Sequence, residues 1–158
     1  MATRHQMIRQ VQAAKAPPAQ PASVAVVIPV YNSAGTLYRA LQSVFAQTLL
    51  PSQVIVVDDG SRDDPRSALG EFADRISFNV QLNSGAAAAR NNAVARANAD
   101  LIAFLDADDY WHPRKLELQV RAFSQDSDLL VCCTGYRCVS PMQAQAPWPL
   151  IDAVDLVR

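Results

Sequence analysis

Short apolar runs that end abruptly in polar residues constrain the fold of this chain more than any other feature. Residues 24–30, 54–57 and 101–105 read VAVVIPV, VIVV and LIAFL, and polar or acidic residues follow each run. Such runs are typical of strands buried on both faces of a parallel sheet. Segments with helical spacing separate them, and this alternation predicts right-handed β–α–β crossovers. We therefore predict an α/β fold with helices on both faces of a mainly parallel sheet.

The remaining elements follow from periodicity and from the placement of proline and glycine. Pro29 cannot donate a ladder hydrogen bond, so we expect it at the end of its strand. Two further strands are predicted over 76–82 and 129–139, and 151–157 suits the start of a helix. The predicted helices cover about 33–47, 63–74, 86–98 and 113–123.

Composition limits the classes of protein to which the chain can belong. The 158 residues are about one domain long, and 50% of them are hydrophobic. A net charge of −1 argues against a nucleic-acid-binding surface. Three cysteines in one apolar stretch are expected to be buried small side chains in a reducing compartment. With no membrane-length apolar run and no signal-peptide pattern, we expect a cytoplasmic protein.

Three carboxylates follow the third apolar run. Asp106, Asp108 and Asp109 should lie at the carboxyl end of that strand, where open α/β sheets bind ligands. Carboxylates held this close repel one another unless a cation lies between them. Mg²⁺ and Mn²⁺ prefer such oxygen ligands and often share them with phosphates. The pattern predicts a metal–diphosphate site, and a solvated acidic loop is the alternative.

Other polar residues should gather at the same edge of the sheet. Asp58 or Asp59 can accept a hydrogen bond from a base or ribose, or simply form a turn before a glycine. The segment 83–85 precedes a helix whose first amides favour an anion, although an ordinary turn would look the same. Arg90 could offset diphosphate charge or be a solvated arginine. Tyr31 could cover a base or be an aromatic residue at the rim.

Four ordered motifs in this sequence resemble those of family 2 glycosyltransferases with the GT-A fold. They are VIPVYN at 27–32, VVDDGS at 56–61, the segment 83–91 with its Asn-x-Gly and Arg-Asn pairs, and LDADD at 105–109. The resemblance implies a Rossmann-like α/β/α sandwich that forms the nucleotide-sugar-binding half of such an enzyme. The resemblance makes residues 24–139 a nucleotide-sugar-binding domain and residues 140–158 an extension that leads toward a missing acceptor-binding half. The proline-rich segment 1–23 is expected from its composition to be a flexible linker.

The resemblance also implies roles for individual residues. Pro29 and Tyr31 would flank the base, and Asp59 would bond to it. Asp106 would lie near the ribose and the metal, and Asp108 would bind the Mn²⁺ or Mg²⁺ that bridges the diphosphate. The implied nucleotide-binding residues are Pro29, Tyr31, Asp59, Gly85, Arg90 and Asp106.

The implied reaction is inverting transfer of a sugar from a UDP-type nucleotide sugar to a saccharide or lipid-linked acceptor. A carboxylate base would deprotonate the acceptor hydroxyl, and the family draws that base from a downstream motif. No later acid matches this motif, so we expect the catalytic base to be absent from this chain. We also expect the fragment to self-associate through the exposed edge where the missing half would dock. We expect a cytoplasmic protein that associates peripherally with the inner face of the membrane, where a lipid-linked acceptor would lie. The later acids are Glu117, Asp126, Asp128, Asp152 and Asp155.

Two other functions compete with this interpretation. A non-catalytic nucleotide-binding or interaction module would also carry these motifs. A receiver-like signalling domain would use the acidic pair at 58–59, with Asp106 as phosphoacceptor. That domain needs a lysine after a later strand, but the last lysine here is Lys115, and the strand at 24–30 would be surplus.

Overall fold

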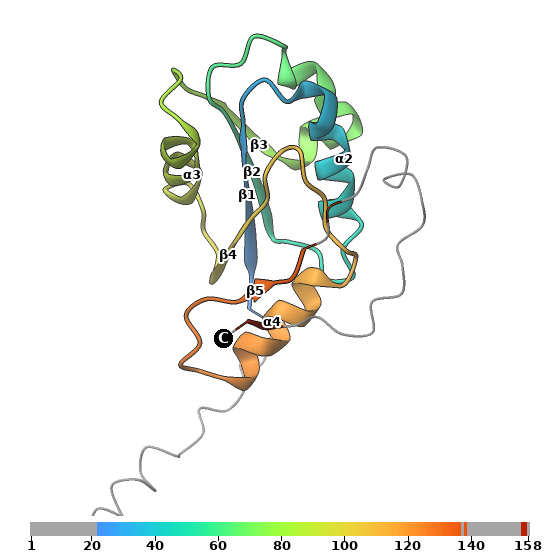
Figure 1. Cartoon of the computed structure of the whole chain (residues 1–158), viewed down its shortest axis with the longest axis vertical. Helices are drawn as coiled ribbons and strands as arrows, with labels where there is room; N and C mark the ends of the chain where they lie inside the picture. Colours follow the sequence, from blue (N-terminus) through green and yellow to red (C-terminus); the bar gives the residue numbers. More distant parts are fainter. Residues whose placement is uncertain (1–21, 137, 139–155, 158) are drawn as a thin grey trace, which may run out of the picture.

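A four-stranded parallel sheet lies at the centre of the part of the chain that the computed structural model describes, residues 22–136, 138 and 156–157 (Figure 1). The strands are in the order β3-β2-β1-β4, and every neighbouring pair is parallel. This arrangement confirms the predicted α/β fold. Their bounds are Val24–Val30 for β1, Gln53–Asp58 for β2, Ser77–Val80 for β3 and Leu101–Phe104 for β4.

Helices cover both faces of the sheet, as predicted. Helix α2 (Ala34–Phe45) and the 3₁₀ segment η1 (Pro65–Arg75) lie on one face, and α3 (Ala86–Val94) lies on the other (Figure 1). The side chains of β1 alternate between the two cores: Ile28 packs with the α2 side, and Val27 packs with the α3 side. Because both faces are covered, every residue of β1 is buried, and its sequence is a continuous apolar run.

The last strand of the sheet differs from its prediction. We expected the run at 101–105 to be buried on both faces, but among the described residues β4 pairs only with β1 and is the outermost strand of the sheet. Residues 101–103 are half-buried, and the Phe104 side chain is 52% exposed. The apolar run correctly predicted a strand. It could not predict the position of that strand in the sheet, because strand order is decided by the crossover connections.

Pro29 lies second to last in β1, close to the predicted strand end. The carbonyl of Val27 accepts a hydrogen bond from the amide of Leu105 at 3.0 Å, so Val27 faces β4. Pro29 faces the same side, since backbone polar groups alternate along a strand. The β1–β4 pairing ends at Phe104, and the missing N–H of Pro29 therefore leaves no ladder bond unmade.

Several element predictions need correction. The segment predicted as one helix over 63–74 is a 3₁₀ segment interrupted at Gly70, whose φ is +53°. Helix α3 ends at residue 94 instead of about 98, and α4 spans Lys115–Gln125. Within the described part of the strand predicted over 129–139, only β5 (Cys133–Thr134) is a strand. It pairs antiparallel with β6 (Leu156–Val157), where we expected a helix.

The cysteines also differ from their prediction. Cys133 and Cys138 are exposed, and Cys132 is half-buried, because the segment that carries them does not join the parallel sheet. The predicted linker over 1–23 lies outside the described residues except for its last two. Most of the extension over 140–158, including Asp152 and Asp155, also lies outside them.

Candidate functional site

The loops that follow the four strands of the sheet are joined to one another by side-chain contacts. The amide of Asn32 donates to Oγ of Ser61 at 3.0 Å, which connects the loops after β1 and β2. The carboxylate of Asp59 then reaches the loop after β3, and Arg90 of α3 pairs with Asp106 after β4. The structure therefore brings the predicted polar clusters together at the carboxyl edge of the sheet, the usual ligand-binding edge of such folds.

Asp59 is the most enclosed acid of this edge, with only 2% of its surface exposed. Its Oδ1 accepts hydrogen bonds from Nε2 of Gln81 at 2.7 Å and from the amide of Ser84 at 2.8 Å. Its Oδ2 accepts from the amide of Gly85 at 2.8 Å. Burial alone would raise the pKa of Asp59, but these three hydrogen bonds together lower it. The carboxylate thus holds the loop before α3 in place.

Asp58 closes the turn that follows β2. Its Oδ1 accepts a hydrogen bond from the amide of Ser61 at 2.9 Å, and the residue is 7% exposed. Gly60 between them has a φ of +75°, and a Cβ there would lie 3.1 Å from the backbone nitrogen of Asn83. A glycine at this position lets the loops after β2 and β3 approach closely.

The first turn of α3 faces open space. Gly85 is its N-cap residue with a φ of +89°, and a Cβ on Gly85 would meet nothing within 4 Å. Ala86 and Ala87 are exposed, and the helix start has no side-chain cap hydrogen bond. The amides of Ser84 and Gly85 are already bound to Asp59, so the amides of the first helical turn remain to face an anion.

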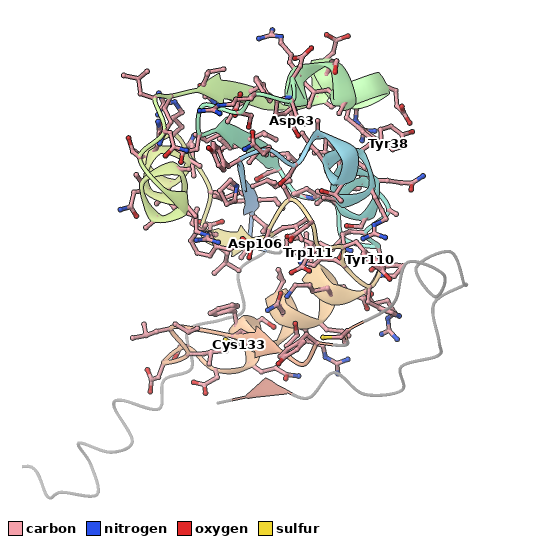
Figure 2. The ribbon with its side chains drawn as sticks, turned by 45° about the horizontal axis from the view of Figure 1, so that its top comes forward. Tyr38, Asp63, Asp106, Tyr110, Trp111 and Cys133 are labelled. Atoms are coloured by element: carbon pink, nitrogen blue, oxygen red, sulfur yellow. The ribbon has the colours of Figure 1, made fainter. Side chains whose placement is uncertain are left out.

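The acidic loop after β4 is exposed and carries mutually repelling charges. Nη2 of Arg90 lies 2.5 Å from Oδ1 of Asp106, while Asp108 and Asp109 are exposed. Partial burial raises the pKa of Asp109, the nearby carboxylates of Asp108 and Asp106 raise it further, and Arg39 opposes them. Figure 2 shows Asp106 beside the end of β4.

Arg39 is a site residue that the sequence patterns did not reveal. Its Nη2 donates to the backbone carbonyl of Asp108 at 3.4 Å, and its guanidinium lies 4.3 Å from the centre of the Tyr110 ring. This arginine lies on α2, and only tertiary packing brings α2 next to the loop after β4. A helical arginine without a local motif gives no sequence signal for such a contact.

The acids of this loop fit a divalent cation that arrives together with a diphosphate. Within the described residues, no group of three or more His, Cys, Asp or Glu side chains forms a ready metal site. Mg²⁺-type sites often use only one or two carboxylates and take the other ligands from phosphates and water. Asp106 and Asp108 are two exposed carboxylates on one short loop, and they match that incomplete ligand set.

Two of the base-binding residues implied by the resemblance, Pro29 and Tyr31, lie at the end of β1. Pro29 is buried within the strand, and Tyr31 follows it with 48% of its surface exposed. Asn32 adopts a φ of +50° and donates to Ser61, and its Oδ1 accepts from the amide of Arg62 at 2.9 Å. Tyr31 therefore belongs to a loop that is hydrogen-bonded to the loop after β2.

Comparison with known proteins agrees with the resemblance drawn from the motifs. The sequence model of the family described as Glycosyl transferase family 2 matches residues 25–146. An uncharacterized glycosyltransferase of Nostoc sp. (strain PCC 7120 / SAG 25.82 / UTEX 2576) is 40% identical over 111 residues, which are 68% of this chain and 34% of the relative. The Escherichia coli UDP-Glc:alpha-D-GlcNAc-diphosphoundecaprenol beta-1,3-glucosyltransferase WfgD is 40% identical over 99 residues, 61% of this chain and 39% of that protein.

Solved structures share the fold. The mannosyltransferase PcManGT from Pyrobaculum calidifontis, in complex with GDP-Man and Mn²⁺, has a TM-score of 0.56 and 26% identity, covering 76% of this chain and 37% of that one. S. aureus TarS 1-349 in complex with UDP-GlcNAc has a TM-score of 0.57 and 25% identity, covering 65% and 31%. The chain thus spans about a third of the length of these relatives. No helix among the described residues is both long and apolar enough to cross a membrane.

Proposed function

The chain belongs to glycosyl transferase family 2, and we propose that it is the donor-binding part of an inverting glycosyltransferase that uses a nucleotide-diphosphate sugar. The observation that carries this proposal is the joined carboxyl edge, where the open first turn of α3 and the Arg90–Asp106 pair lie next to the acidic loop. A UDP-type donor is supported by the relative named for UDP-Glc and by the neighbour in complex with UDP-GlcNAc.

Each side of the proposed site has a chemical task. Asp106 and Asp108 would hold Mn²⁺ or Mg²⁺ against the diphosphate, and Mn²⁺ in the complex of the mannosyltransferase supports that choice. When bound, the cation would supply Lewis-acid stabilisation of the departing diphosphate. Arg90 and the first-turn amides of α3 would offset the remaining negative charge.

The nucleoside would lie against the ends of β1 and β2. Tyr31 exposes enough of its ring to cover a base, and Pro29 would border the same space. Asp59 would contribute in two ways: it holds the loop at 81–85 in place, and the oxygen with a single protein donor, Oδ2, keeps a lone pair for the base.

Transfer to an acceptor also requires a base, which we place outside the described residues. Both carboxylate oxygens of Glu117 already accept hydrogen bonds, from Thr48 and from Arg114. Asp126 and Asp128 lie at the end of α4. General-base assistance contributes about 10²–10⁴-fold to a rate, so described residues alone would bind a donor without efficient transfer to a saccharide or lipid-linked hydroxyl.

Calorimetry with UDP tests the proposed site. We expect UDP to bind more tightly with Mn²⁺ than with EDTA, and Asp108→Asn to remove that difference. Asp128→Asn, which changes another exposed acid, is the matched control and should keep it. Equal UDP affinity with Mn²⁺ and EDTA in the unaltered protein would refute the metal site. Because the base is placed elsewhere, we expect this metal-dependent UDP binding without efficient sugar transfer, which distinguishes donor binding from catalysis.

A further inference from the structure

We propose that Gln47 and Ser43, near the end of α2, are positioning residues that hold the acidic loop in the shape required to bind a divalent cation. This inference rests on the proposed function, because it takes Asp106 and Asp108 as the ligands. Neither residue belongs to the motifs that identified the site, and neither touches the carboxylates. Their effect would pass through the backbone that follows the loop.

The acidic loop is anchored upstream by the sheet. The amide of Leu105 donates to the carbonyl of Val27 at 3.0 Å, and the side chains of Leu105 and Ala107 are 2% and 4% exposed. A turn follows, in which the amide of Asp109 donates to the carbonyl of Asp106 at 3.0 Å. The two buried side chains alternate with exposed Asp106 and Asp108, so the direction of both carboxylates depends on how this short segment is held.

The downstream anchor comes from α2. The amide of Trp111 donates to Oγ of Ser43 at 3.0 Å, and that hydroxyl donates in turn to the carbonyl of Ala40 at 2.7 Å. Trp111 is 7% exposed and belongs to the core cluster on the α2 face of the sheet. The hydroxyl of Ser43 therefore fixes the backbone two residues after Asp109.

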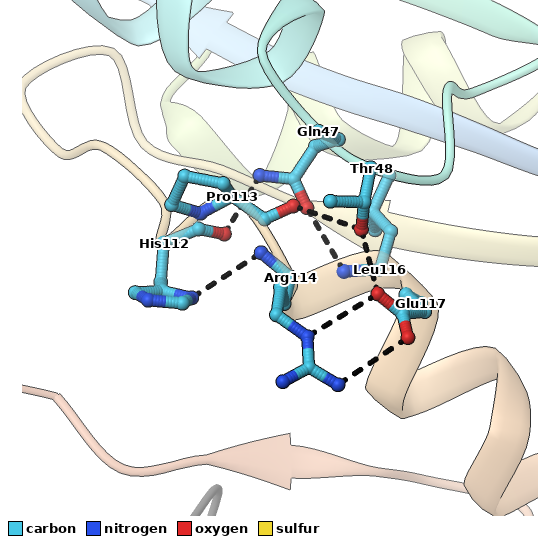
Figure 3. A network of polar contacts seen from close by, with 7 residues as sticks. All are labelled: Gln47, Thr48, His112, Pro113, Arg114, Leu116 and Glu117. Atoms are coloured by element: carbon cyan, nitrogen blue, oxygen red, sulfur yellow. Dashed lines mark hydrogen bonds and ion pairs between the residues drawn. The ribbon is translucent and has the colours of Figure 1, made fainter. Parts of the chain in front are cut away.

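Gln47 extends this anchor to the start of α4 (Figure 3). Its side chain is 5% exposed, and its Nε2 donates to the carbonyls of His112 at 2.8 Å and Ser43 at 3.1 Å. Its Oε1 accepts from the amide of Leu116 at 3.0 Å, in the first turn of α4. One buried amide thus satisfies two carbonyls and one orphan helix amide, and joins the loop exit, α2 and α4.

The chemistry of this anchor calls for a side-chain amide. A glutamate at position 47 could accept from Leu116, but as a carboxylate it would have no N–H to donate and would face two carbonyl oxygens. The Thr48 contacts, by contrast, hold α4 without touching residues 105–111: its backbone amide donates to the carbonyl of Pro113 at 2.8 Å, and its hydroxyl donates to Glu117 at 2.8 Å. Thr48→Val is therefore a matched control on the same helix end.

Groups that orient metal ligands from behind commonly change metal affinity by about 10–100-fold when they are altered. We expect Ser43→Ala and Gln47→Glu to weaken Mn²⁺ binding by a factor in that range when UDP is present. UDP affinity in EDTA should not change, because the proposed contacts of the nucleobase and of the diphosphate with the first turn of α3 do not involve Ser43 or Gln47. Thr48→Val should retain the unaltered Mn²⁺ affinity even if it lowers the melting temperature.

The experiment is a titration of Mn²⁺ into the full chain with saturating UDP, followed by the electron paramagnetic resonance signal of free Mn²⁺, with melting temperature and UDP affinity in EDTA measured in parallel. Failure of the unaltered protein to bind Mn²⁺ would overturn the proposed metal site and this inference with it. Normal Mn²⁺ binding by the unaltered protein and by Ser43→Ala would overturn only the positioning role. Ser43→Ala removes a single hydroxyl, so it decides the matter even if Gln47→Glu does not fold.

Discussion

The guanidinium of Arg90 lies 2.5 Å from a carboxylate oxygen of Asp106, and this ion pair joins the second turn of α3 to the loop after β4. Both side chains are partly exposed, 34% for Arg90 and 52% for Asp106. The pair neutralises one proposed metal ligand with one proposed diphosphate contact. Binding of a metal–diphosphate would therefore exchange this ion pair for contacts with the ligand.

Removing Arg90 should change two affinities in opposite directions. Arg90→Ala frees Asp106, so Mn²⁺ alone should bind more tightly, while UDP with Mn²⁺ should bind less tightly by about 1.5–3 kcal/mol, the usual value of a hydrogen bond to a charged group. Titration calorimetry of both ligands measures the two effects. Arg121→Ala, at an exposed helical arginine, is the control and should change neither. A loss of both affinities would mean that Arg90 supports the acidic loop and does not compete with the cation for Asp106.

Asp59 should make the fold sensitive to acid. Because the pKa of Asp59 is lower in the folded protein than its ordinary value of 3.8, its hydrogen bonds stabilise the fold fully above about pH 4 and lose that effect as the pH falls through the folded pKa. Asp59→Asn should lower the free energy of unfolding by about 1.5–3 kcal/mol at neutral pH and flatten its dependence on pH below 4.

Urea unfolding at several pH values measures this effect. The control is Asp74→Asn, at an exposed acid of η1, which should leave both the neutral stability and the acid dependence close to those of the unaltered protein. If Asp59→Asn unfolds with the same acid dependence as the unaltered protein, another carboxylate controls acid unfolding.

Two glycines should respond oppositely to alanine. Gly70 has a φ of +53°, and a Cβ there would lie 3.0 Å from the Tyr38 ring, so Gly70→Ala should destabilise the fold by about 1–3 kcal/mol. Gly35 lies in α2, where a Cβ would meet nothing within 4 Å. Gly35→Ala should therefore stabilise the fold by about 0.4–1 kcal/mol. Thermal unfolding measures both shifts, and destabilisation by Gly35→Ala would contradict the open space at that position.

The core and the segment after α4 should tolerate truncation very differently. Leu41 on α2 is fully buried against β1, so Leu41→Ala should cost about 2–5 kcal/mol. Leu130 is 90% exposed, and Leu130→Ala should change the free energy of unfolding by no more than about 0.5 kcal/mol. Denaturant unfolding compares the two. A large cost at Leu130 would mean that this side chain is covered in solution.

Sequence patterns alone predict the alternation of strands and helices and the edge of the sheet at which the polar clusters meet. Continuous apolar runs such as 24–30 identify doubly covered strands, and consecutive parallel strands must present their carboxyl ends at one edge. Those rules are local or topological, so Asp59, Arg90 and Asp106 could be placed at a common edge before any contact was known. The four motifs also indicated the family, because their order and spacing can be read directly.

The contacts between residues across that edge depend on how the strands and helices pack. Strand order placed β4 at the side of the sheet and exposed Phe104, which an apolar run cannot reveal. Asp59 turned toward Gln81 and the loop before α3, and Gln47, which follows α2, reached the exit of the acidic loop. Such partners lie more than twenty residues apart in the chain, and their pairing depends on how helices pack against the sheet, a long-range property that no local pattern encodes.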